Sequence, residues 1–106
     1  MESKPKDMIS WKIQTLETSG TYRFSGRFVA TRGVSELLSE AEIMLIYWLV
    51  RHHVEQNDGI DYLVVFVHEE TGQKLFFIDQ IDDAMKASGG HPKEHDYCTL
   101  LLAEEY

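Results

Sequence analysis

The segment that most limits the fold is a pair of apolar runs separated by a short turn. The first run, Asp61–Glu70, reads DYLVVFVHEE and is rich in valine and aromatic residues. The second run, Gln73–Gln80, reads QKLFFIDQ, and the Thr71-Gly72 pair between the runs is typical of a tight turn. The pattern predicts an antiparallel β-hairpin, which is the clearest element in the sequence.

One long helix is predicted upstream of this hairpin. Ser39 is followed three residues later by Glu42, the spacing of a capping box, so we expect a helix from Glu40 to Gln56. Its apolar arc is wide, which predicts that the helix is covered on more than one side. The residues of its main apolar stripe are Ile43, Ile46, Tyr47, Val50 and Val54.

Weaker patterns fill the rest of the chain. Alternating apolar residues predict a hairpin from the segments 9–16 and 21–31, with residues 32–39 as a connector. A short helix over 81–88 and a last strand over 96–105 complete the order. We expect a flexible N-terminus, residues 1–8, and a single α+β domain, residues 9–106. Its antiparallel β-sheet of about five strands packs on one main helix, with a short second helix.

Charge is unevenly distributed along the 106 residues. The formal net charge is -8, and residues 56–106 carry all of this excess because residues 1–55 balance to zero. An acidic half argues against direct binding of nucleic acid and favours a partner with a basic surface. The carboxylates expected to contact such a partner are Glu69, Glu70, Asp82, Asp83, Glu104 and Glu105.

The chain shows no membrane or export signal at its start. The longest apolar run, Ile43–Val50, is shorter than the roughly 20 residues that a membrane-spanning helix needs. The first ten residues are polar and charged, without the apolar core of a signal peptide. We therefore expect a cytoplasmic monomer without membrane contact.

A histidine-cysteine stretch suggests a metal site. In GGHPKEHDYC, His91, His95 and Cys98 are the residue types that bind zinc, and the flanking glycines and proline allow the backbone to bend. A small core gains stability from such a link, so a structural zinc is the favoured interpretation. The competing interpretation is a polar loop with a small buried cysteine. We expect His53 as the fourth ligand, and the alternatives are His52, His68, Asp79 and Asp82.

The central part of the chain resembles a small family of uncharacterised proteins from Gram-positive bacteria and their mobile elements. The resemblance rests on Thr31–Val34, Leu45–Leu49, Asp61–Phe66 and Gly72-Gln73, and it implies no catalytic residues. By its type, a short acidic single domain, the chain also looks like phage-borne anti-CRISPR proteins of type II systems.

This second resemblance implies a function. We expect a non-enzymatic inhibitor that binds the basic surface of a type II CRISPR effector nuclease in the bacterial cell and hinders DNA loading. Two alternatives remain open. One is a small metal-dependent enzyme that uses the histidine-cysteine cluster, and the other is a host regulatory or adaptor domain with an unknown partner.

Overall fold

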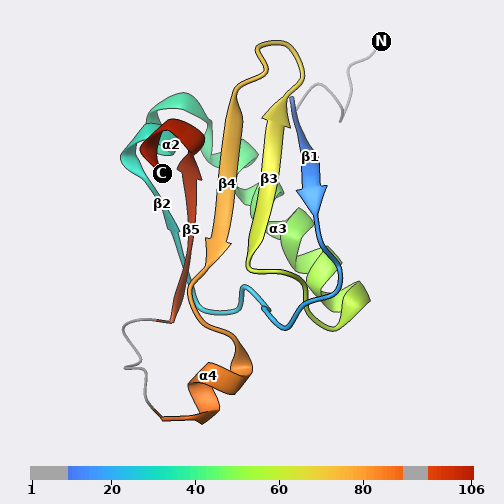
Figure 1. Cartoon of the computed structure of the whole chain (residues 1–106). Helices are drawn as coiled ribbons and strands as arrows, with labels where there is room; N and C mark the ends of the chain where they lie inside the picture. The colour runs from blue at the N-terminus through green and yellow to red at the C-terminus, as the bar shows by residue number, and fades with distance from the viewer. Residues whose placement is uncertain (1–9, 90–95) are drawn as a thin grey trace.

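A five-stranded mixed sheet forms the centre of the molecule (Figure 1). The computed structural model describes residues 10–89 and 96–106. The strand order is β1-β3-β4-β5-β2, and every neighbouring pair is antiparallel except β2 and β5. The predicted α+β class is confirmed. The strands are β1 (Trp11–Leu16), β2 (Arg27–Ala30), β3 (Leu63–His68), β4 (Lys74–Asp79) and β5 (Tyr97–Leu102).

The predicted central hairpin is confirmed and forms the middle of the sheet. Strands β3 and β4 pair antiparallel, with Val65 opposite Phe76. Alternate residues of both strands are fully buried, Val64 and Phe66 in β3 and Leu75 and Phe77 in β4. This alternation, with a period of two residues, is the physical basis of the sequence signal.

The predicted long helix is also confirmed, as α3 (Glu40–Asn57). The Ser39 side chain accepts a hydrogen bond from the Glu42 backbone N–H at 3.1 Å, and the Glu42 carboxylate accepts the Ser39 N–H at 2.9 Å. These two bonds satisfy donors that the first helical turn leaves free. At the other end, Asp58 closes the helix in the left-handed backbone conformation.

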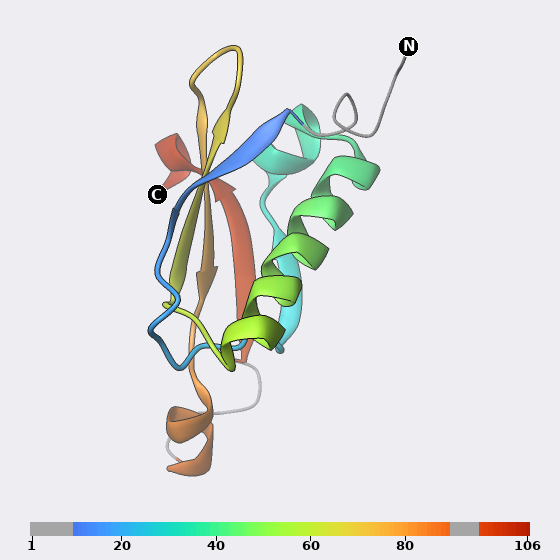
Figure 2. The same cartoon turned by 90° about the vertical axis from the view of Figure 1, so that its right-hand side faces the viewer.

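All of the long helix lies on one face of the sheet (Figure 2). Ile46, Val50 and Val54 of α3 are buried in the core between the helix and the sheet. The outward side of α3 has no element packed over it in the described part of the chain (Figure 2). The expectation that α3 is covered on more than one side is therefore wrong for these residues.

The predicted hairpin between the first two strands is wrong. Strand β1 pairs with β3 at one edge of the sheet, and β2 pairs in parallel with β5 at the other edge. The intervening link crosses the lower end of the sheet (Figure 1), where Tyr22 forms a bridge with Ile60. Phe24 of this link is fully buried, so the alternation of Tyr22 and Phe24 reflects burial of the link and not a strand.

The remaining segments form short helices. The expected connector over residues 32–39 contains a helix, α2 (Arg32–Leu37), because Thr31 caps its first turn by accepting the Val34 N–H. The second predicted helix is α4 (Asp83–Ala87), and β5 is followed by a 3-10 turn, η2 (Ala103–Glu105). Among residues 10–89 and 96–106, no helix is both long and apolar enough to cross a membrane.

The crossing link depends on a glycine at a close backbone approach. A Cβ atom at Gly20 would lie 2.3 Å from the carbonyl carbon and oxygen of Ile60. We predict that Gly20→Ala lowers the free energy of unfolding by about 2 to 3 kcal/mol, because the link must move away from Ile60. Urea denaturation measures this loss. The control Ser19→Ala, at an exposed neighbour, should change stability by less than about 0.5 kcal/mol. Equal midpoints for the two variants would contradict the close packing of the link.

Candidate functional site

Two of the four predicted zinc ligands, Cys98 and His53, lie in the described part of the chain. The other two, His91 and His95, lie outside it. Cys98 is opposite Asp79 of β4, so the chain returns directly to the neighbouring strand. This return puts Cys98 and the C-terminal turns of α3 at the same end of the sheet, with His68 at the opposite end (Figure 1).

His53 and Cys98 lie at the same end of the sheet, but the elements that carry them lie toward opposite edges of it. The last turns of α3 lie toward β1, whereas β5 lies on the other side of β3 and β4 (Figure 1). His53 is half-buried and has the exposed His52 as a ring neighbour at 5.8 Å. Among the described residues, no group of three or more histidine, cysteine, aspartate or glutamate side chains is placed to hold a metal ion. Zinc binding that includes His91 and His95 stays a prediction.

Cys98 itself has the environment of a core residue. Its side chain is fully buried, and its thiol lies 4.0 Å from the carbonyl oxygen of Phe24. Burial, with the nearby Asp79 carboxylate as a second cause, raises the pKa of the Cys98 thiol to about 12. Zinc coordination and nucleophilic attack both require the thiolate. This environment favours the competing interpretation of Cys98 as a small buried side chain.

Asp79, one of the alternative ligands, is the buried carboxylate at the end of β4. It is 2% exposed, and its Oδ2 accepts the backbone N–H of Phe24 at 2.9 Å. Phe24 has a positive φ of 51°, which is a costly conformation for a bulky residue. Burial raises the pKa of Asp79, and its Oδ1 accepts no hydrogen bond from any described residue. The carboxylate therefore holds the crossing link in a strained conformation.

Three of the predicted partner-binding carboxylates have internal roles. Asp82 caps α4 by accepting the Met85 N–H, and the Thr21 hydroxyl donates to it at 2.6 Å, which lowers the pKa of Asp82. Asp83 pairs with the Arg23 guanidinium at 2.8 Å. Glu105 accepts a hydrogen bond at 2.6 Å from Thr31, the first cause of its lowered pKa, and also accepts bonds from the N–H groups of Leu102 and Gly33.

The other three lie at the opposite end of the molecule from α4. Glu69 at the hairpin tip pairs with Lys12 at 2.8 Å. Glu70 and Glu104 are exposed, and no described residue bonds to their carboxylates. The hairpin tip and α4 form the two ends of the elongated molecule, so the predicted carboxylates do not form one continuous patch (Figure 1).

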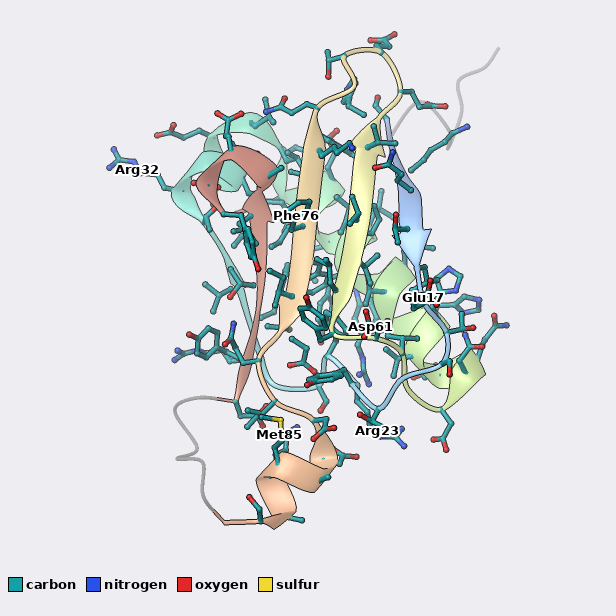
Figure 3. The ribbon with its side chains drawn as sticks, viewed as in Figure 1. Glu17, Arg23, Arg32, Asp61, Phe76 and Met85 are labelled. Carbon is teal, nitrogen blue, oxygen red and sulfur yellow. The ribbon has the colours of Figure 1, made fainter. Side chains whose placement is uncertain are left out.

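Four other carboxylates, which were not predicted as contacts, have no side-chain partner among the described residues. Glu17 and Asp61 are neighbours, since the Asp61 N–H donates to the Glu17 carbonyl, and Figure 3 shows both at the lower end of the sheet. Glu40 and Glu55 are exposed on α3. Within the described residues, none of these four carboxylates forms a hydrogen bond or ion pair through its side chain.

Trp48 is a candidate contact residue that the sequence interpretation missed. It is not one of the residues of the predicted apolar stripe, and it is 61% exposed although the helix was expected to be covered on more than one side. The helical phase carried the missing signal, because Trp48 and Leu45 lie on the side opposite the buried Val50.

The buried Asp79 predicts a specific pH dependence. Because the folded state raises its pKa above the unfolded value of about 3.9, the protonated carboxyl is favoured by folding. Its contribution to stability is full below the unfolded pKa and is lost as pH rises through the folded pKa. Asp79→Asn keeps an oxygen acceptor for Phe24 without the charge, so its stability relative to the wild type should rise with pH above about 4.

Urea denaturation of both proteins at several pH values measures this difference. The control Asp79→Ala removes the acceptor, so it should lower the free energy of unfolding by about 1 to 3 kcal/mol where the wild-type carboxyl is protonated. An Asp79→Asn variant that loses stability relative to the wild type as pH rises would contradict the assigned cause of the shift.

The burial of Cys98 predicts slow thiol chemistry. In the native protein at pH 8, a thiol-specific disulfide reagent should react at least about a hundredfold more slowly than in the urea-unfolded chain, because reaction requires opening of the core. Absorbance of the released thiolate measures the rate. Packing predicts the same slow rate with and without a zinc chelator. A rate that increases after chelation would show instead that a metal protects Cys98.

Comparisons with known proteins supply no relative: no family model, no curated protein and no solved structure matches the chain.

Proposed function

We propose that the chain is a non-enzymatic inhibitor that binds the basic nucleic-acid-binding surface of a type II RNA-guided nuclease in the bacterial cytoplasm. The observation that supports this proposal is that most described basic side chains bond within the chain, whereas several carboxylates do not. Lys12, Arg23, Arg32 and Lys86 each pair with a carboxylate of the same chain. Among the described residues, the carboxylates with neither an ion pair nor a side-chain hydrogen bond are Glu17, Glu40, Glu55, Asp61, Glu70 and Glu104.

The Arg51 side chain also forms a hydrogen bond within the chain. It is half-buried, and its Nη1 donates a hydrogen bond to the carbonyl of Arg23. Arg27 and Lys74 are exposed without an ion pair, so unpaired carboxylates outnumber unpaired basic side chains six to two among the described residues. A surface of this kind attracts a lysine- and arginine-lined channel and repels nucleic acid.

A positively charged channel that receives DNA also favours binding of a folded protein with a negative surface. The heteroduplex channel of an RNA-guided nuclease is positively charged and recognises the nucleic-acid backbone rather than its sequence. Glu40 and Glu55 are presented by α3, and the other unpaired carboxylates lie in turns and links of the same folded domain, so binding loses little backbone entropy. Competition with DNA for the channel needs no chemical step, which agrees with a non-enzymatic role.

A cleavage assay tests the proposal. A purified type II nuclease with its guide RNA cleaves a labelled target DNA in the presence of increasing concentrations of the chain. We expect inhibition at low salt, with an inhibition constant that rises at least about tenfold between about 0.05 M and 0.2 M salt. No inhibition at either salt concentration would contradict the function, and salt-independent inhibition would contradict the electrostatic mechanism.

Two matched double variants distinguish a specific contact from general charge. Glu70→Gln with Glu104→Gln, and Glu17→Gln with Asp61→Asn, remove the same charge from unpaired carboxylates in different parts of the molecule. Because the carboxylates act through long-range attraction, both double variants should weaken inhibition to the same degree, within about twofold. A first double variant that weakens inhibition severalfold more than the second would instead identify Glu70 and Glu104 as fixed contacts.

A further inference from the structure

Trp48 is held at the surface by a series of aromatic contacts that begins in the core. Its ring lies 5.3 Å from that of Tyr47, which stacks on Phe28 at 4.7 Å. Phe28 in turn packs against the buried Phe77 at 5.4 Å. The exposed indole therefore packs against neighbours that are themselves packed on the core. Little conformational entropy is lost when a partner covers it.

Apolar neighbours extend this exposed surface. Leu45 and Met44 lie within one helical turn of Trp48 and are 38% and 41% exposed. Aromatic and aliphatic side chains that cluster in this way are typical of the centre of a protein interface. We define the α3 face as Met44, Leu45 and Trp48.

Two unpaired carboxylates lie beside the α3 face. Glu55 lies on the same outward line of the helix as Trp48, seven residues further on, and Glu40 precedes the face. Neither carboxylate has an ion-pair partner in the described ranges. The basic residue of α2, Arg32, pairs with Glu36 at 3.1 Å.

The open face of the sheet is apolar too, but its side chains cover one another. Val65, Phe76 and Leu101 are cross-strand neighbours and are only partly exposed. The Tyr106 ring lies 5.4 Å from that of Phe76, which Figure 3 shows at the centre of this face. Tyr106 itself is 77% exposed, and no described unpaired carboxylate of the helix α3 lies on this face.

We propose that the α3 face docks into an apolar groove rimmed by lysine and arginine on the partner protein, with Trp48 as the central contact. This inference rests on the proposed function and adds the surface that is used. The carboxylates beside the face match a basic rim. They also disfavour a second copy of this chain as the occupant, because two copies would bring the same carboxylates together and each carries a net charge of -8.

Binding of fluorescently labelled chain to the purified nuclease–guide complex tests the inference. Trp48→Ala should weaken binding at least about tenfold, as expected for a central aromatic contact, and Trp48→Phe should restore part of the loss. The matched control is Tyr106→Ala, which removes an aromatic side chain that is 77% exposed outside the α3 face, and it should stay within about twofold of the wild type. Thermal unfolding checks that each variant folds.

The other outcomes show whether the inference alone or the proposed function as well is overturned. If the wild type binds and Trp48→Ala binds equally well, the inference is overturned and the proposed function stands. If the wild type does not bind, both are overturned. Analytical ultracentrifugation of the chain alone should find a monomer, and a dimer that Trp48→Ala dissociates would show that a second copy, not a basic groove, occupies the α3 face.

Discussion

The hydrogen bond from the Phe24 N–H to the buried carboxylate of Asp79 is the contact on which the arrangement of the other elements depends. It fixes the link that crosses below the sheet, at a residue whose own backbone conformation is unfavourable. The link leads into β2, which lies at the far edge of the sheet and pairs in parallel with β5. From that position Phe28 stacks on Tyr47 of α3, and Tyr47 supports Trp48. A buried carboxylate at one end of the sheet thus helps to determine how an aromatic side chain is presented on the helix.

Local sequence patterns predicted the elements that are stabilised locally. The β3–β4 hairpin and the capped helix α3 depend on residues close in sequence, so alternation and the Ser39–Glu42 spacing were sufficient. The first two strands failed because alternation reports which residues are buried and not which strand they pair with. Tyr22 and Phe24 alternate, yet they belong to a link whose burial depends on Asp79, 55 residues further along the chain than Phe24.

The sequence predicted the negative charge of the candidate site, but it did not predict which carboxylates bond within the chain. The sequence shows that carboxylates are in excess, but Asp82 and Glu105 accept hydrogen bonds within the chain and are held by them. Only the folded chain distinguishes such residues from Glu70 and Glu104. Trp48 was missed for a related reason: a wide apolar arc on a helix predicts burial, whereas one side of α3 faces solvent in the described structure. The zinc prediction also depends on His91 and His95, which lie outside the described residues, so it stays a prediction.

Charge and apolar surface have different parts in the proposed interaction. Unpaired carboxylates attract a basic surface from a distance and set the rate of association, and their effect is screened by salt. The α3 face contributes short-range contacts that set how slowly the complex dissociates. A domain of this size can combine both because its helix carries the apolar side chains and unpaired carboxylates together.

The most direct test of this account is site-specific photo-crosslinking to the nuclease–guide complex. A photoreactive phenylalanine analogue replaces Leu45, which leaves Trp48 intact, and in a second protein it replaces Tyr106. The account predicts a crosslink to the nuclease from position 45 that Trp48→Ala removes, and little from position 106. Crosslinking from position 106 without crosslinking from position 45 would show that the partner binds elsewhere and would contradict the central claim.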